Sequence, residues 1–191
     1  MKALITFIIV AIFVWAFYAC NSAKTDTAAS AAPSKDSLIK RGNYLVTAMG
    51  CNDCHSPKKM GPQGPYVDTA TMLSGFPSNR PIPVAAAEDS KNGMVVMNGD
   101  LTGYVGPWGT SFAANITSDA TGIGSWSLDQ FKLAIRSGKY MGLKEGRMIV
   151  PPMPWQDFAN LTDADVEAIF MYLKSTKPVK NVVPAYRPPG K

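Results

Sequence analysis

Five consecutive residues constrain this chain more than any other feature: Cys51, Asn52, Asp53, Cys54 and His55. They form the pattern C-x-x-C-H, which is the attachment signature of a c-type haem. Each thiol can add to one vinyl group of the porphyrin, and the histidine is then held against one face of the ring, where an imidazole nitrogen can bind iron. The motif therefore predicts one covalent haem c, with Cys51 and Cys54 as thioether sites and His55 as the proximal iron ligand.

Two other interpretations of the motif are weaker. A structural zinc site needs four Cys or His ligands, but His55 is the only histidine and the one cysteine outside the motif, Cys20, follows an apolar leader. A thioredoxin-like dithiol normally lies near a βαβ pattern. This motif instead follows a helical pattern and runs into Ser56-Pro57, which ends a helix.

The first residues predict export and a membrane anchor. After Met1-Lys2, residues 3–19 are apolar almost without a break, close to the lower limit of about 17 residues for crossing a bilayer. Cys20 follows at once, which resembles a bacterial lipoprotein signal cleaved before a cysteine that is then lipidated, although Phe17 and Tyr18 are bulkier than usual. An uncleaved anchor helix and ordinary cleavage are the alternatives. All three place the domain outside the cytoplasm, on the periplasmic side, and the first two keep it on the membrane.

Residues 20–36 are predicted to be a lipid-anchored, disordered tether, because their Ser, Ala, Thr and Lys residues show no apolar periodicity. A random coil of this length has ends roughly 20 Å apart. Such a tether keeps the domain near the membrane and lets it reorient.

Three segments have the pattern of capped helices. Residues 37–49 begin with Ser37 as N-cap and present an apolar face of Leu38, Tyr44, Leu45, Ala48 and Met49. Residues 127–137 begin with a capping box and end before Gly138; their predicted buried face is Leu128, Phe131, Ala134 and Ile135. The last helix begins after Thr162, and its buried face is predicted to be Val166, Ile169, Phe170 and Leu173.

The middle of the chain, residues 61–125, is rich in Gly, Pro, Asn and Asp and is predicted to be a loop-rich insertion. A short apolar run at residues 94–97 is followed by Asn98-Gly99-Asp100, a hairpin-type turn signal. We expect two short strands or an extended loop here.

Iron needs a second axial ligand or an open site. A second histidine is excluded by the composition, and a methionine thioether is the common alternative. Met153 stands between Pro152 and Pro154, which fix the backbone on either side and present the side chain from a stiff loop. Met153 is therefore the predicted distal ligand; Met148 and an open site are the alternatives.

Two further predictions concern the surroundings of the haem. Trp126 ends a tight turn, and its N–H could donate to a haem propionate; a tryptophan of the core or of a lid is the alternative. The net charge of +5 suits an acidic redox partner, which would meet Lys58 and Lys59, together with Lys144 and Arg147. An untargeted, solvated surface is the alternative.

These features together resemble class I cytochromes c. Residues 105–184 are similar to monohaem domains of membrane-associated bacterial cytochromes, some of which are electron-accepting subunits of dehydrogenases. The resemblance rests on Asn115-Ile116-Thr117, Gly122-Ile123-Gly124-Ser125-Trp126, Pro151-Pro152-Met153-Pro154-Trp155, Leu161-Thr162-Asp163-Ala164-Asp165 and Asn181-Val182-Val183-Pro184. It implies a mainly α fold around the haem, with Cys51, Cys54, His55 and Met153 in the roles given above.

The resemblance also implies that Gly42 lies where the first and last helices cross; a tolerated surface glycine is the alternative. The predicted cytochrome domain spans residues 37–185, after a leader over 1–19 and before a tail over 186–191. With a single haem motif, the predicted function is one-electron transfer by a membrane-tethered carrier that is not itself an enzyme. An open-site haem sensor or enzyme and a fixed haem subunit of a dehydrogenase or oxidase are the alternatives.

Overall fold

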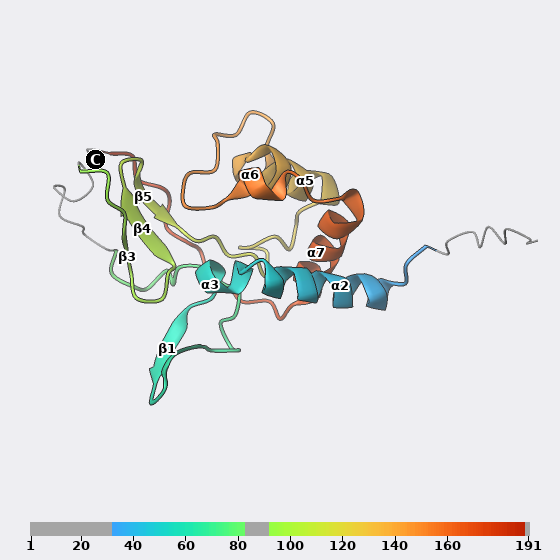
Figure 1. The fold of residues 1–191 in the computed structure, drawn as a ribbon, viewed down its shortest axis with the longest axis horizontal. Coiled ribbons are helices and arrows are strands. Elements are labelled where there is room, and N and C mark those ends of the chain that lie inside the picture. The colour runs from blue at the N-terminus through green and yellow to red at the C-terminus, as the bar shows by residue number, and fades with distance from the viewer. Residues whose placement is uncertain (1–31, 83–91, 190–191) are drawn as a thin grey trace, which may run out of the picture. The chain divides into compact units, whose positions relative to one another are not determined.

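The structure is a computed structural model that describes residues 32–82 and 92–189 (Figure 1). The predicted leader, the lipidation site Cys20 and most of the predicted tether lie outside the described residues. The chain from Ser34 onward forms one compact unit. Within the described ranges, no helix has both the length and the apolar character needed to cross a membrane.

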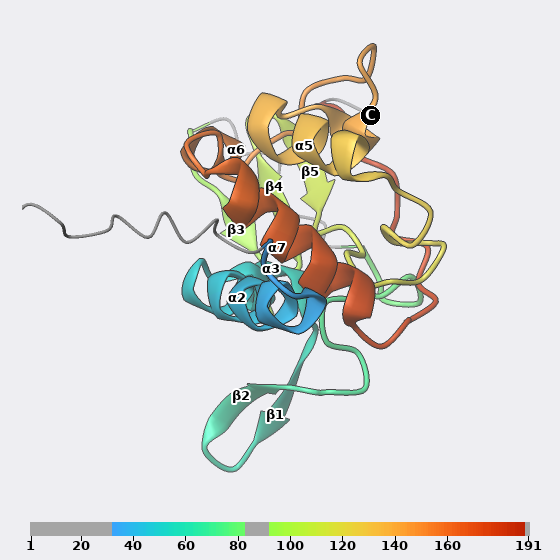
Figure 2. The same cartoon turned by 90° about the vertical axis from the view of Figure 1, so that its right-hand side faces the viewer.

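The first and last helices of this unit cross each other (Figure 2). Helix α2 spans Lys35–Ala48 and α7 spans Asp163–Ser175, and they share the most extensive helix–helix contact of the domain. Helix α2 begins three residues earlier than predicted, because its N-cap is Ser34 and not Ser37. The Ser34 hydroxyl accepts the capping hydrogen bond from the Ser37 N–H over 3.2 Å. The tether prediction therefore extended slightly into the helix.

The buried face of α2 differs in part from the predicted one. Leu45 is buried as expected, but Tyr44 is 62% exposed and Ala48 is exposed, whereas Val46 and Gly42 are buried. The position of Gly42 at the crossing with α7 confirms the expectation drawn from the resemblance. In α7 all four predicted core residues are buried, and Thr162 accepts the capping hydrogen bond from Asp165 N–H over 3.1 Å.

Helix α5, Leu128–Ser137, has the predicted capping box, with Ser127 and Gln130 bonded to each other's backbone N–H groups. Gly138 ends it in the left-handed conformation. Phe131 packs against Phe170 of α7, with ring centroids 5.5 Å apart. Leu128 is only partly buried. Two short helices were not predicted: the 3₁₀ helix η1, Tyr140–Gly142, and α6, Trp155–Phe158.

The chain between α3 and α5 forms two small antiparallel sheets. Strands β1, Lys58–Gly61, and β2, Gly64–Val67, form a hairpin that was not predicted. Strands β3, Val96–Met97, β4, Gly103–Gly106, and β5, Gly109–Phe112, form a second sheet in the order β3-β4-β5, so the strand alternative holds for the residues after Met94. The fold is nevertheless mainly α, as predicted, with the core between α2, α5 and α7.

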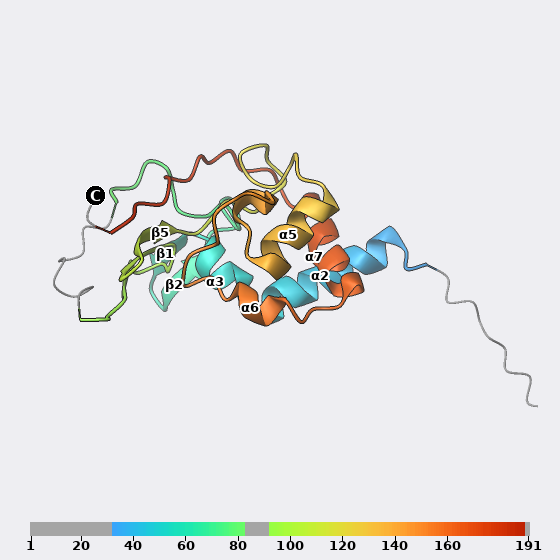
Figure 3. The same ribbon diagram turned by 90° about the horizontal axis from the view of Figure 1, so that it is seen from above.

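The segment after α7 runs back along the domain to β5 (Figure 3). Arg187 and Thr110 exchange two backbone hydrogen bonds, of 2.8 Å and 3.0 Å. The Tyr186 hydroxyl donates to the Trp108 carbonyl over 2.5 Å. Residues 186–187, which we predicted to belong to a tail, therefore pair with the second sheet.

Candidate haem site

The C-x-x-C-H motif forms a five-residue helix, α3, Cys51–His55. Gly50 separates α3 from α2 and takes a left-handed conformation, with φ of 70°, which an L-residue with a side chain adopts only under strain. Cys51 and Cys54 are three positions apart, so their side chains project from one face of the helix. Both are half-buried free thiols. This arrangement allows both sulfurs to reach one planar group.

The Cys51 thiol does not have the character of a redox-active cysteine. Burial raises the pKa of the Cys51 thiol to about 11; the Cys51 backbone hydrogen bond opposes this rise, and Cys54 adds to it. Reactive cysteines of thioredoxin-like motifs have lowered pKa values. The raised pKa therefore argues against thiolate chemistry at Cys51.

His55 is buried and held by a backbone carbonyl. Its Nδ1 lies 2.7 Å from the Ala114 oxygen, and because a carbonyl only accepts, Nδ1 carries the hydrogen. Burial lowers the pKa of His55, and the hydrogen bond with Ala114 partly opposes this shift. The neutral ring therefore keeps its Nε2 lone pair for a metal, the usual arrangement of a ligating histidine whose other ring nitrogen donates to a carbonyl.

His55 is held by two neighbouring segments, one at Gly75 and one at Ala113, which also bond to each other. The Gly75 N–H donates to the His55 carbonyl over 2.7 Å, and Phe76 N–H donates to the Ala113 carbonyl over 2.9 Å. A side chain at Gly75 would meet the Ala113 oxygen at 2.4 Å, so only glycine allows the two segments to approach so closely. Ala114 was not predicted, because a backbone carbonyl leaves no signal in the residue type.

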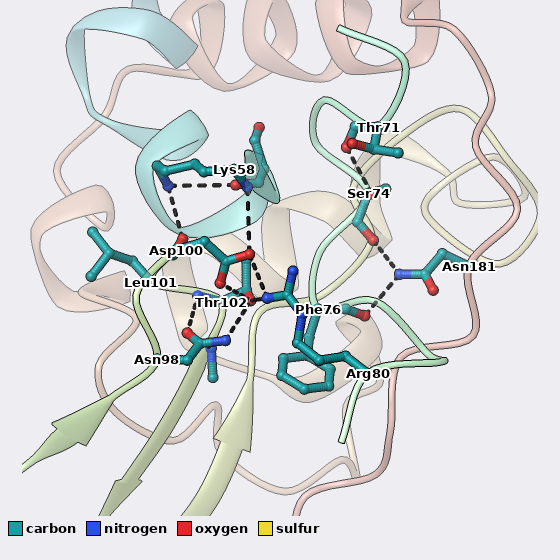
Figure 4. A network of polar contacts seen from close by, with 12 residues as sticks. Lys58, Thr71, Ser74, Phe76, Arg80, Asn98, Asp100, Leu101, Thr102 and Asn181 are labelled. Atoms are coloured by element: carbon teal, nitrogen blue, oxygen red, sulfur yellow. Dashed lines mark hydrogen bonds and ion pairs between the residues drawn. The ribbon is translucent and has the colours of Figure 1, made fainter. Parts of the chain in front are cut away.

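Lys58 lies three residues after the motif, and its ammonium group bonds within the protein. Its Nζ donates to the carbonyls of Asp53, over 2.5 Å, and Asp100, over 2.8 Å (Figure 4). Arg80 forms an ion pair with Asp100 over 2.5 Å, and Thr102 also donates to this carboxylate. The network ties the end of α3 to the insertion. Lys59 pairs with Asp68 over 2.6 Å.

Tyr104 on β4 covers the second cysteine of the motif. Its hydroxyl lies 3.1 Å from Cys54 Sγ and also donates to the Leu101 carbonyl. Tyr104 is buried, and burial raises the pKa of its hydroxyl, with Cys54 adding to the shift. The sequence interpretation missed this residue; an aromatic in a Gly-rich turn region was its only signal.

The segment that carries Met153 leads into α6, which Figures 1 and 2 place above α3. Met153 is partly buried, and its carbonyl accepts from the Trp155 N–H over 3.0 Å. Two residues earlier, the Pro151 carbonyl accepts from Ser111 Oγ over 2.8 Å. Met148, the alternative ligand, is 43% exposed. The ring of Trp126 is partly buried against the core between the helices.

The donor set fits haem rather than a protein-ligated metal. Within residues 32–82 and 92–189, no three His, Cys, Asp or Glu side chains lie close enough together to hold a metal ion. A haem iron needs only axial ligands from the protein, because the porphyrin supplies four nitrogens. Nε2 of the neutral His55 can supply one axial ligand, and the two thiols on one face of α3 can attach the porphyrin.

Comparison with known proteins agrees with this geometry. Residues 39–177 match the sequence profile of the cytochrome c family. The chain is 31% identical over 140 residues to the gluconate 2-dehydrogenase cytochrome c subunit of Pantoea cypripedii, an alignment that covers 73% of this chain and 23% of that protein. It is 30% identical over 154 residues to the cytochrome c subunit of alcohol dehydrogenase (quinone) of Gluconobacter oxydans, covering 80% of this chain and 24% of that protein.

A further relative is a subunit of the nicotinate dehydrogenase of Pseudomonas putida, which is 42% identical over 80 residues, covering 41% of this chain and 6% of that protein. The chain thus spans about a quarter or less of the length of these relatives. The profile match and the site place it in one class: the chain belongs to the cytochrome c family. It carries covalent haem c with its iron, and its function is electron transfer.

Proposed function

We propose that this chain is a one-electron carrier whose haem is attached to Cys51 and Cys54 and whose iron is ligated by His55 and Met153. The hydrogen bond between His55 Nδ1 and the Ala114 carbonyl is the observation that carries the proposal, because it leaves Nε2 available as the proximal ligand. The haem supplies one-electron chemistry between Fe(III) and Fe(II). The protein's part is to keep both ligands in place, so that no substrate reaches the metal and the chain is not itself an enzyme.

The distal ligand is tested by absorption spectroscopy of the haem-loaded protein. The oxidised protein should show the weak far-red band of a thioether–iron bond, and Met153→Ala should abolish it. Met148→Ala is the matched control, since Met148 lies five residues away on the exposed part of the same segment, and it should keep the band. A band that survives Met153→Ala would contradict ligation by Met153. Rapid binding of CO by the reduced native protein would favour an open site instead.

A second candidate function, a haem subunit fixed inside a dehydrogenase complex, is supported by the names of the relatives, which are cytochrome or other subunits of dehydrogenases for gluconate, alcohol, fructose and nicotinate. Gentle membrane extraction distinguishes the two. A large partner that co-purifies in a fixed ratio would favour the fixed subunit, whereas a carrier should separate from its donor and acceptor.

The location we propose is the periplasmic side of a bacterial membrane, with lipidated Cys20 as the anchor and the following residues as the tether. The apolar run over residues 3–19 and the cysteine that follows it support this proposal. The intact mass of the native protein should lack residues 1–19 and should show acyl chains on Cys20. A mass that still includes residues 1–19, without acyl chains, would favour an uncleaved anchor helix.

The docking face we propose is the loop over residues 139–149, called here the docking loop. Its four large apolar side chains are each between 40% and 51% exposed: Tyr140, Met141, Leu143 and Met148. Lys144 and Arg147 are exposed beside them, with Glu145 as the one acid in the loop. An apolar centre with cations at its edge suits a partner with an apolar patch and acidic surroundings.

Contacts within the docking loop support this assignment. Tyr140 N–H donates to the Arg147 carbonyl over 2.9 Å, and the Arg147 guanidinium lies 3.9 Å from the centre of the Tyr140 ring. Met141 adopts a left-handed conformation, with φ of 57°, which costs about 1–3 kcal/mol in a residue other than glycine. The loop is therefore held in a defined shape that presents apolar side chains to solvent. Lys58, whose Nζ is occupied by carbonyls, is left out of this face.

Trp126 is the proposed donor to a haem propionate. Its side chain packs against the helical core, which supports a fixed ring orientation. A rigid indole beside the cofactor could hold a propionate with its N–H, the only donor of that side chain.

A further inference from the structure

The second sheet contacts the segment of the proposed distal ligand through one buried hydroxyl. Ser111 lies on β5 and is 6% exposed. Its Oγ donates to the Pro151 carbonyl over 2.8 Å, two residues before Met153. It also accepts a hydrogen bond from Trp108 Nε1 over 3.1 Å. The single hydroxyl hydrogen is thus directed at Pro151 because the indole N–H occupies an acceptor position of the oxygen.

The indole that orients this hydroxyl is itself fixed. A β-carbon on Gly106 would lie 2.7 Å from the Trp108 ring, so the ring packs flat on the glycine backbone across the β4–β5 turn. The Trp108 carbonyl accepts from the Tyr186 hydroxyl over 2.5 Å. A connected series of hydrogen bonds therefore runs from Trp108 through Ser111 to Pro151. It starts on the β4–β5 turn and ends on the segment that carries Met153.

We propose that Ser111 is a positioning residue for Met153, and that the second sheet sets how firmly this methionine stays on the iron. The proposal rests on the proposed ligation by Met153. Between Gly138 and Trp155 the regular structure consists of the three-residue helix η1 and one bridge between Lys139 and Met148, so the part that carries Met153 depends on individual bonds. Removing the Ser111 hydroxyl would leave the Trp108 N–H without an acceptor and free the Pro151 carbonyl from the sheet.

The expected consequence is a larger population in which the methionine has left the iron. A part-buried hydrogen bond of this kind is worth about 0.5–1.5 kcal/mol, and the upper end of this range corresponds to about a tenfold change in an equilibrium. Ser111→Ala should raise the rate of CO binding to the reduced protein about tenfold, because CO binds only the methionine-free form. On heating, the far-red band of oxidised Ser111→Ala should also disappear at a lower temperature than that of the parent protein.

Three comparisons isolate the role of the hydroxyl. Thr110→Val is the matched control: it removes a hydroxyl from the neighbouring residue of β5, whose side chain makes no hydrogen bond to residues 32–82 or 92–189, and it should leave CO binding unchanged. Trp108→Phe removes the N–H but keeps a ring, and should shift CO binding in the same direction by a smaller factor. Combining it with Ser111→Ala should add less than the sum of the two effects, because both act on one series of bonds.

The measurements separate this proposal from the ligation on which it rests. If Met153→Ala leaves the far-red band intact, the ligation itself is wrong. If Met153→Ala abolishes the band but Ser111→Ala binds CO at the rate of the Thr110→Val control, Ser111 has no positioning role and the proposal fails. Ser111→Thr, which keeps the oxygen, provides a rescue: slow CO binding in this variant supports the proposal, and CO binding as fast as in Ser111→Ala contradicts it.

Discussion

Gly42 of α2 lies directly against the backbone of Ala168 in α7: a β-carbon at Gly42 would stand 2.0 Å from the Ala168 carbonyl oxygen. The same carbon would be 2.6 Å from Cβ of Tyr172. Neither neighbour can move away by rotating a side chain. The two helices can cross at this distance only because residue 42 has no side chain, which explains a glycine inside a helix where it costs about 1 kcal/mol relative to alanine.

We expect Gly42→Ala to destabilise the haem-loaded protein by about 2 kcal/mol. Overpacking against an unyielding backbone costs about 3 kcal/mol, and the better helix propensity of alanine returns about 1 kcal/mol. The free energy of unfolding from denaturant titration measures this difference. Gly99→Ala is the control, because a β-carbon there meets no atom of the described structure within 4 Å. Equal stability of the two variants would show that the helices separate without cost.

The network around Asp100 gives a prediction about pH. Burial by itself would raise the pKa of Asp100, but hydrogen bonds from Arg80 and Thr102 outweigh it and hold the pKa below its usual value. A carboxyl group with a lowered pKa stabilises the folded protein fully above the pKa of the unfolded chain, about 3.9, and loses this contribution as the pH falls through the folded value. Asp100→Asn should therefore cost about 2 kcal/mol at neutral pH.

Thermal unfolding at several pH values tests this prediction. The difference between Asp100→Asn and the parent should stay constant from about pH 5 to 8 and shrink below about pH 4. Asp68→Asn removes an exposed ion pair with Lys59 instead and should have a smaller effect that salt reduces further. A constant difference between the Asp100 variant and the parent down to the lowest pH would mean that its charge does not matter.

Lys58 and the docking loop are expected to respond differently to mutation. Lys58→Met removes a donor to three carbonyls, those of Asp53, Ser56 and Asp100, and should lower the thermal midpoint without changing how the rate of electron exchange depends on salt. Lys144→Gln should keep the midpoint but slow association with an acidic partner about two- to threefold at low ionic strength, with a weaker salt dependence. Stopped-flow electron exchange with an acidic redox protein measures both. If Lys58→Met instead weakens the salt dependence of electron exchange and Lys144→Gln does not, Lys58 belongs to the docking face.

Local rules explain why some elements were predictable. Ser127, Gln130 and Gly138 mark both ends of α5 through bonds within a few residues of each other, so the sequence alone defines them. The same rules were ambiguous at α2, where Ser34 and Ser37 are both good caps and only the structure shows that Ser34 accepts the bond. The predicted apolar face of α2 was partly wrong because the face that carries Gly42 packs on α7. Val46, four residues after Gly42 and on the same face, is therefore buried, whereas Tyr44 is exposed.

Sequence could indicate only those residues of the site that act through a characteristic side chain at a characteristic spacing. Cys51, Cys54 and His55 are recognisable because their spacing is itself the chemical requirement. Ala114 acts through its carbonyl, and Ser111 acts on another carbonyl 40 residues away, so neither position has a residue type that indicates its role. The internal bonds of Lys58 could not be predicted for a similar reason, since one of them goes to the backbone carbonyl of Asp100, 42 residues away in the sequence.

The last prediction concerns Trp126. A contact with a haem propionate would make this residue affect the reduction potential, whereas a purely structural role would make it affect stability alone. Trp126→Phe keeps an aromatic ring against the core and removes only the N–H. If the N–H holds a propionate, as we propose, the variant should show a shifted reduction potential and a stronger dependence of that potential on pH, with a small loss of stability. Phe131→Leu is the control, since the Phe131 ring packs against Phe170 in the core between the helices and should affect stability alone. An unchanged potential together with lowered stability in Trp126→Phe would assign this tryptophan to the core.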